Sequence, residues 1–208
     1  MITYQSTTLE NYVESIYNHI DIRHPENINL STIAEILKIP TYFLPLNSQV
    51  VTFNGLRINI DSRLSPPEQW EDFGHELCHV LRQYGSQLNM QTDFLTYQEE
   101  KADNFALHFC VPTFMLEELE LPLQRSLVIG FIAETFNVTP LFAKKRLERY
   151  EQQLLGSKYS AQLQAQFEAE QEFKRQIGCD YVHEDSHNTY LINRNNGIVG
   201  IINKRSDY

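Results

Sequence analysis

The feature that most constrains this chain is a segment in which apolar residues and histidines take opposite sides of one helix. From Ser65 to Tyr84 the sequence reads SPPEQWEDFGHELCHVLRQY, and its serine and prolines are typical of a helix start. At about 100° per residue, His75 and His79 project together from one side. Roughly opposite them lies a single apolar stripe, which comprises Trp70, Phe73, Leu77, Val80, Leu81 and Tyr84. The pattern predicts a helix that is anchored by its stripe and presents two imidazoles one turn apart.

The two histidines belong to an HExxH pattern within GHELCHV. Imidazoles four residues apart on a helix can bind one metal ion, and zinc is the ion that this pattern most often holds. Glu76 lies between the two faces, where its carboxylate can reach an attacking water as a general base without ligating the metal. The alternative is a pair of partly exposed histidines on a surface helix. A third ligand close by favours the metal site.

Two histidines leave a catalytic zinc ion one protein ligand short, and residues 95–110 supply a candidate. Glu99 and Asp103 fall on one face of this predicted helix together with small side chains, namely Ala102, Ala106 and Cys110. Because small side chains let the helix approach the first one, we predict Glu99 as the third ligand. Asp103, one turn later, can accept a hydrogen bond from a ligand imidazole. Glu100 points about 100° away and is interpreted as an ordinary acid in a first helical turn.

Two further groups compete for a metal. Cys78 lies near His75 around the helix, and thiolates bind zinc well. Three ligands from one turn would be strained, so a buried, inert thiol is the favoured interpretation. The letters HExxH recur from His183 to His187 without an apolar stripe and just before a predicted strand, where residues four apart lie about 13 Å from one another. Cys179, His183 and His187 could still form an accessory metal site, but a solvated polar loop is the favoured interpretation.

Helical apolar spacing recurs along most of the chain. It predicts helices at residues 8–20 and 30–38, two helices within 122–155 that are divided at NVTP, and another at 158–177. Asn29 or Ser31 can cap the second of these.

Strands are predicted in two places, which makes the expected fold class α+β. Residues 41–61 are rich in β-branched and aromatic residues and predict a small antiparallel sheet, with a hairpin signal at Asn54-Gly55. Pro45 confines its strand to an edge or a bulge. A second hairpin is predicted around Asn196-Gly197.

The composition narrows the class of protein. Of the 208 residues 42% are apolar and 21% are charged, as in an ordinary globular chain. No stretch approaches the length of a transmembrane helix and no signal region is present, so we expect a cytoplasmic protein. Three cysteines that lie far apart fit a reducing compartment. The net charge of −10 argues against broad, nonspecific binding of nucleic acid.

With these residues in place, the sequence resembles the ImmA/IrrE family of metallopeptidases. The family pattern is a strand with Ile-Asn, a helix with HExxH, and a helix with ExxA that is followed by Asn or Asp, by Phe-Ala and by a later Pro. The matching positions here are Ile58-Asn59, His75 to His79, Glu99 to Asp103, Phe105-Ala106 and Pro112. The resemblance continues more weakly to about residue 155.

The resemblance implies zinc at His75, His79 and Glu99, with Glu76 as the base. It implies an endopeptidase of bacterial or phage origin that cleaves a regulatory DNA-binding protein, such as a repressor that silences a prophage or mobile element. Such an anti-repressor enzyme needs an oxyanion-stabilising side chain, for which proximity in sequence offers Arg82, Tyr84 and Tyr97. The sheet edge within 41–61 could hold an extended substrate.

The resemblance and the predicted elements together suggest three parts. These are a zinc metallopeptidase core at 1–120, a helical subdomain packed on it at 121–155, and an appendage of a helix and a β-hairpin at 156–208. The expected architecture is a mainly helical, zincin-like core with a small N-terminal antiparallel sheet. The appendage is expected to select the substrate or to cover the core, because one hairpin face is apolar through Tyr190, Ile192, Ile198 and Ile202.

A rival interpretation rests on residues 129–150. Two short helices around Asn137-Val138-Thr139 resemble a helix-turn-helix, and the second carries basic residues, namely Lys144, Lys145, Arg146 and Arg149. The chain could then be a DNA-binding or protein-binding regulator with a non-catalytic metal site. A packed helical hairpin with a solvated basic end is favoured, because the chain is acidic and Glu148 interrupts the basic run.

Overall fold

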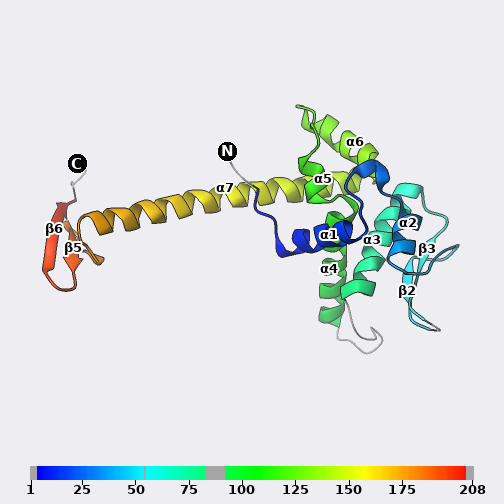
Figure 1. Cartoon of the computed structure of the whole chain (residues 1–208), viewed down its shortest axis with the longest axis horizontal. Helices are drawn as coiled ribbons and strands as arrows, with labels where there is room; N and C mark the ends of the chain where they lie inside the picture. The colour runs from blue at the N-terminus through cyan, green and yellow to red at the C-terminus, as the bar shows by residue number, and fades with distance from the viewer. Residues whose placement is uncertain (1–3, 54, 83–91, 205–208) are drawn as a thin grey trace. The chain divides into compact units, whose positions relative to one another are not determined.

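The computed structural model describes residues 4–53, 55–82 and 92–204 (Figure 1). It divides the chain into two units, one of Gln5–Gln153 and one of Met1–Tyr4 with Leu154–Tyr208. The α+β class is confirmed, since helices dominate and each unit contains one small sheet.

The first helices begin where the sequence provides caps. Helix α1 (Thr8–His19) opens with a capping box, in which the N–H of Glu10 donates to Thr7 Oγ1 and the N–H of Thr7 donates to the Glu10 carboxylate. Asn29 caps α2 (Leu30–Ile36) by accepting from the N–H of Thr32. Helix α3 (Pro66–Arg82) starts directly after Ser65, as predicted.

The sheet of the first unit contains β1 (Thr41–Leu44), β2 (Gln49–Val51) and β3 (Arg57–Asp61) in the order β1-β3-β2. The prediction of an antiparallel sheet is wrong for one pairing: β2 and β3 are antiparallel, but β1 and β3 are parallel. The reason lies in β3. Its Ile58 and Ile60 are completely buried, and the polar residues that alternate with them are almost completely buried. A strand covered on both faces takes the centre, and β1, which ends before Pro45, lies at an edge.

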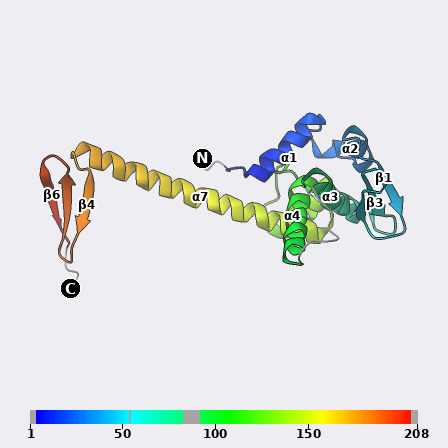
Figure 2. The same ribbon diagram turned by 90° about the horizontal axis from the view of Figure 1, so that it is seen from below.

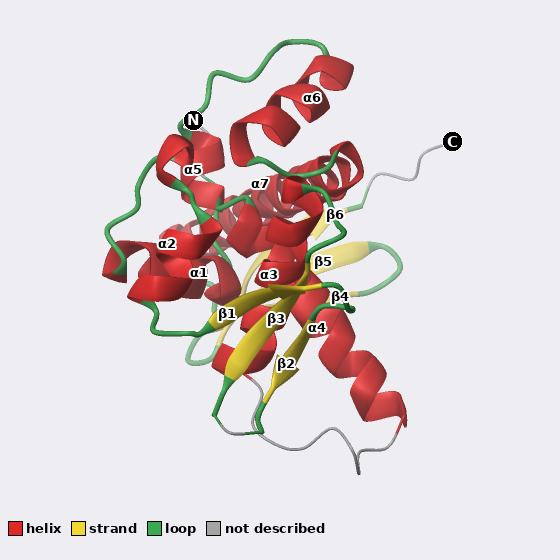
Figure 3. Cartoon of the chain, turned by 90° about the vertical axis from the view of Figure 1, so that its right-hand side faces the viewer, coloured by secondary structure: helices red, strands yellow, loops and turns green. Residues whose placement is uncertain are grey.

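Helix α3 packs on β3 and β2, and α4 (Thr92–Cys110) lies beside α3 in both views (Figures 1 and 2). Figure 3 shows α3 behind the β1-β3-β2 sheet. The apolar stripe of α3 faces the core through the stacked rings of Trp70 and Phe73, and α4 adds Phe105 and Phe109. The helix that carries His75 is therefore fixed between a sheet and a second helix.

Three more helices complete the core of the first unit: α5 (Thr113–Glu117), α6 (Arg125–Phe136) and the N-terminal part of α7 (Pro140–Gln176). Asn137 ends α6 in the left-handed conformation, within the predicted NVTP division. The prediction of a separate helix at 158–177 is wrong, because α7 continues through Gly156. One glycine costs a helix only about 1 kcal/mol, and good helix formers flank this one.

The second unit contains the C-terminal part of α7 and the strands β4 (Tyr181–Glu184), β5 (Asn188–Asn193) and β6 (Gly197–Asn203). The hairpin at Asn196-Gly197 is confirmed, and Gly197 has the positive φ of 72° that such a turn favours. The loop interpretation of 183–187 is wrong at its start, since β4 includes His183 and pairs with β5.

Among the described residues, no single helix is both long enough and apolar enough to cross a membrane; α6 and α7 meet such a criterion only when combined, and they are bent by 112°.

Candidate metal centre

The structure brings together the three residues that were predicted as metal ligands. His75 and His79 extend from α3 and Glu99 extends from the facing helix α4, so that one nitrogen or oxygen of each lies within 4.8 Å of the others. His75 Nε2 lies 3.1 Å from His79 Nε2 and 3.1 Å from Glu99 Oε2, and His79 Nε2 lies 3.7 Å from Glu99 Oε1. Within the described parts of the chain, no other group of three potential ligands converges in this way.

These separations fit a tetrahedral metal ion. Ligand atoms about 2.05 Å from a tetrahedral zinc are about 3.3 Å from one another. The two distances of 3.1 Å are close to this value, and the distance of 3.7 Å runs from His79 to the other carboxylate oxygen of Glu99. Two imidazole nitrogens and one carboxylate oxygen are also the donor set of catalytic zinc sites, in which the fourth position is left for water or substrate. Both rings are partly exposed, so the site is reachable from solvent.

Asp103 supports the first histidine. Its Oδ1 lies 2.8 Å from His75 Nδ1, one helical turn after Glu99. A carboxylate at this position accepts the Nδ1 proton, and the lone pair of Nε2 is then directed at the other two ligand atoms. The orientation of His75 is thus set by a residue on the opposite helix.

Gly74 lets the two helices approach each other. A Cβ at this position would lie 2.6 Å from Cys110 Sγ and 3.5 Å from Ala106, both on α4. Ala102, Ala106 and Cys110 are buried in this interface, as the prediction of close approach requires. The role of Gly74 was not predicted. The signal that could have indicated it is a glycine within the helix, directly before His75.

Glu76 is half-buried beside the ligands and contacts the sheet. Burial raises the pKa of its carboxyl above the ordinary value, while His75, His79 and a hydrogen bond from the N–H of Val50 lower it. A carboxylate with a raised pKa binds a proton more readily, as a general base must. The bond from Val50 on β2 was not predicted, because strand pairing does not reveal which backbone amides contact a side chain.

The competing residues lie elsewhere. Cys78 is buried with its Sγ 3.9 Å from the carbonyl of Lys101. Glu100 is exposed and does not belong to the group of converging ligands; it lines an open cavity with Asp103, Lys145 and Arg149. His108 is buried near Glu10.

The proposed oxyanion residues are placed only in part. Tyr84 and the side chain of Arg82 lie outside the described residues. Tyr97 is exposed on α4, about 200° around the helix from Glu99, and its ring contacts Lys101. Tyr97 therefore points away from the face that carries the ligands.

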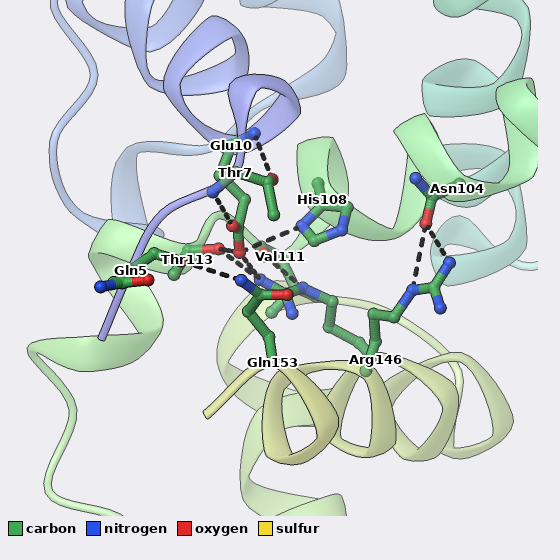
Figure 4. A network of polar contacts seen from close by, with 10 residues as sticks. Gln5, Thr7, Glu10, Asn104, His108, Val111, Thr113, Arg146 and Gln153 are labelled. Atoms are coloured by element: carbon green, nitrogen blue, oxygen red, sulfur yellow. Dashed lines mark hydrogen bonds and ion pairs between the residues drawn. The ribbon is translucent and has the colours of Figure 1, made fainter. Parts of the chain in front are cut away.

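Arg146 bears on the DNA-binding interpretation of residues 129–150. It is fully buried, where Nε donates to the carbonyl of Val111 and Nη2 donates to Thr113 Oγ1 (Figure 4). Thr113 in turn donates to the buried carboxylate of Glu10. Arg146 cannot reach a DNA phosphate without unfolding this network, and Lys144, Lys145 and Arg149 remain as the exposed cations of that segment.

Comparisons with known proteins cover the same region. The model of a peptidase family described as the IrrE N-terminal-like domain matches residues 34–148. The chain is 42% identical over 156 residues to phage-like element PBSX protein XkdA of Bacillus subtilis (strain 168), which covers 74% of this chain and 79% of that protein. It is 40% identical over 158 residues to a protein named YqaB of the same organism, with coverage of 76% and 92%.

Proposed function

Since this chain belongs to the peptidase family of the IrrE N-terminal-like domain, we propose that it is a zinc-dependent endopeptidase that cleaves a DNA-binding regulatory protein. The observation that carries the proposal is the convergence of His75, His79 and Glu99 from two facing helices, with Glu76 beside them. The family is one of metallopeptidase-type hydrolases; the choice of zinc follows from the His, His, Glu donor set.

The residues around the site suit hydrolysis of a peptide bond. A zinc ion held there would polarise the scissile carbonyl and acidify a water molecule. Glu76 accepts the proton of that water and delivers it to the leaving amine. Asp103 keeps the ring of His75 in the orientation that its 2.8 Å contact defines.

The sheet offers a place for an extended substrate. Strands β1 and β2 are the edges of the β1-β3-β2 sheet, and β2 contacts α3 and Glu76. A peptide added along such an edge would satisfy backbone groups while its scissile bond approaches Glu76.

The proposed substrate is a regulatory DNA-binding protein, and more specifically a repressor of a phage or mobile element. Its support is the 42% identity to a protein whose name assigns it to a phage-like element. The rival function, DNA binding by residues 129–150, is disfavoured by the burial of Arg146. A DNA-binding assay over increasing salt separates the two, because phosphate contacts weaken steeply with salt.

The central experiment combines metal analysis with co-expression of a candidate substrate, for which a DNA-binding regulator encoded near the gene of this protein is the first choice. We expect about one zinc per chain and cleavage of the regulator. Glu76→Gln should keep the zinc but lose cleavage by a factor of about 100 or more, because a general base and not a ligand is removed. Loss of zinc in Glu76→Gln, or full cleavage by it, contradicts the assignment.

A further inference from the structure

The second unit has little core of its own. Within its described residues, the buried side chains are those of Ser157, Cys179 and Leu191. Of the residues that the structure describes, none beyond Tyr150 belongs to the hydrophobic core cluster or packs against it. A three-stranded sheet needs a hydrophobic face packed against something to be stable, and units of this size rarely supply that packing alone.

The C-terminal part of α7 carries an exposed apolar stripe. Its members recur mostly at intervals of four residues and are 48–66% exposed: Leu155, Tyr159, Leu163, Phe167 and Phe173. At about 100° per residue they fall within roughly 120° of one another. Glu170 and Lys174 fall within the stripe, and their charges neutralise each other there, since Lys174 Nζ lies 2.5 Å from Glu170 Oε1.

The sheet of the same unit presents an apolar face. The register places Tyr190 opposite Ile201 and Ile192 opposite Ile198 and Tyr181. A bulge beside Leu191 and Ile192 shifts the alternation by one residue, so Ile201 rather than the predicted Ile202 shares the face of Tyr190. Three members of this sheet face are 49–57% exposed: Tyr181, Ile198 and Ile201.

We propose that the stripe on α7 and this sheet face bind the same surfaces of a second copy of the chain. The eight exposed side chains named above are each about half exposed. If the full accessible area of a large side chain is roughly 200 Å², they expose about 800 Å² of surface per copy. That is the area which each partner buries in a standard protein interface. The surface is therefore large enough for a stable two-fold dimer.

Charge also favours a second copy over the regulatory substrate. Residues 154–208 contain seven acidic and six basic residues, whereas residues 1–153 contain 20 acidic and 11 basic ones. Self-association through the nearly neutral unit is not opposed by repulsion, as it would be through the acidic part. A basic DNA-binding protein would instead be attracted to the acidic part. The unit also begins after the family match, which ends at residue 148.

The test is the molar mass of the full chain, measured by sedimentation equilibrium between about 1 and 100 μM. We expect a monomer of 24.4 kDa to convert to a dimer within this range. Tyr159→Glu with Phe167→Glu places charges on the stripe, and Ile198→Lys with Ile201→Lys places them on the sheet face. Each double variant should raise the dimer dissociation constant at least tenfold.

A matched control lies on the other side of the same helix. Ala161 and Ala165 are exposed about 180° and 140° from the centre of the stripe, so Ala161→Glu with Ala165→Glu adds the same two charges and should leave the dissociation constant unchanged. Circular dichroism should show the helical content of wild type in each variant. A wild-type chain that stays monomeric at 100 μM overturns the proposal, as do double variants that dimerise like wild type. Neither outcome depends on zinc or cleavage, so the proposed function is judged separately.

Discussion

At the scale of single residues, Glu99, Glu100 and Asp103 make a sharp test because they share one helix but differ in direction. Glu99→Ala removes a ligand oxygen and should abolish stoichiometric zinc binding. Asp103→Ala removes only the hydrogen bond to His75, which should weaken zinc affinity about 10–100-fold. Glu100→Ala is the control and should leave affinity unchanged. Competition with a zinc chelator measures all three, and a site emptied by Glu100→Ala would refute the ligand assignment.

His108 provides a second residue-scale prediction, which concerns stability. Burial, aided by Arg146 and Arg149 and opposed by Glu10, lowers the pKa of His108 from 6.5 to about 4. Between pH 6.5 and pH 4 this histidine is protonated in the unfolded chain but neutral in the folded chain. The free energy of unfolding therefore falls as the pH drops from 6.5 to 4. The effect is about 3 kcal/mol at most.

His108→Gln should therefore flatten the pH dependence in that window. Urea unfolding at pH 7 and pH 5 gives the change in the free energy of unfolding for wild type and for the variant. The titration of all other groups cancels when the two changes are compared. His24→Gln, at an exposed histidine, is the control and should keep the wild-type slope. Parallel slopes for wild type and His108→Gln would show that His108 is not held neutral.

At the scale of elements, the contact between α3 and α4 decides whether the ligands converge. Gly74→Ala adds a methyl group against Cys110 Sγ, which should destabilise the fold by about 1–3 kcal/mol and weaken zinc binding as α3 moves from Glu99. Cys110→Ala should restore part of both losses, since it removes the contacted atom. Gly156→Ala meets open space within α7 and should be neutral or stabilising. Thermal unfolding and chelator competition give both readouts, and a fully stable, zinc-binding Gly74→Ala would contradict this account.

Local periodicity explains which elements could be predicted from the sequence. The turn-by-turn spacing of α3 and α4 assigns His75, His79, Glu99 and Asp103 to the sides of the helices on which the structure places them. The parallel pairing of β1 could not be predicted, because alternation indicates the faces of a strand but not its neighbours. The same limit applies to Val50, whose amide reaches Glu76 through tertiary packing. Gly156 misled the prediction of α7, because its local cost is outweighed by the helix around it.

At the scale of the whole molecule, the metal site requires the first unit but not the second. Every predicted ligand, the base and the whole core cluster lie within Gln5–Gln153, and the polar network around Arg146 closes there as well. A chain that ends at residue 155 should therefore fold and bind about one zinc per molecule. It should no longer dimerise, and its cleavage of the natural regulator should fall at least tenfold, because the C-terminal unit that is expected to select the substrate has been removed.

Zinc content, sedimentation and cleavage of the co-expressed regulator measure these three outcomes on the shortened chain. An unstructured peptide that contains the cleaved sequence provides the control. Its hydrolysis depends on Glu76, the metal ligands and the sheet edge, all of which the shortened chain keeps, so it should continue at the wild-type rate. Equal loss of both activities would place the C-terminal unit in the chemistry or the fold of the site. Full retention of both would limit its role to self-association, since the site would then act on the regulator as a single copy.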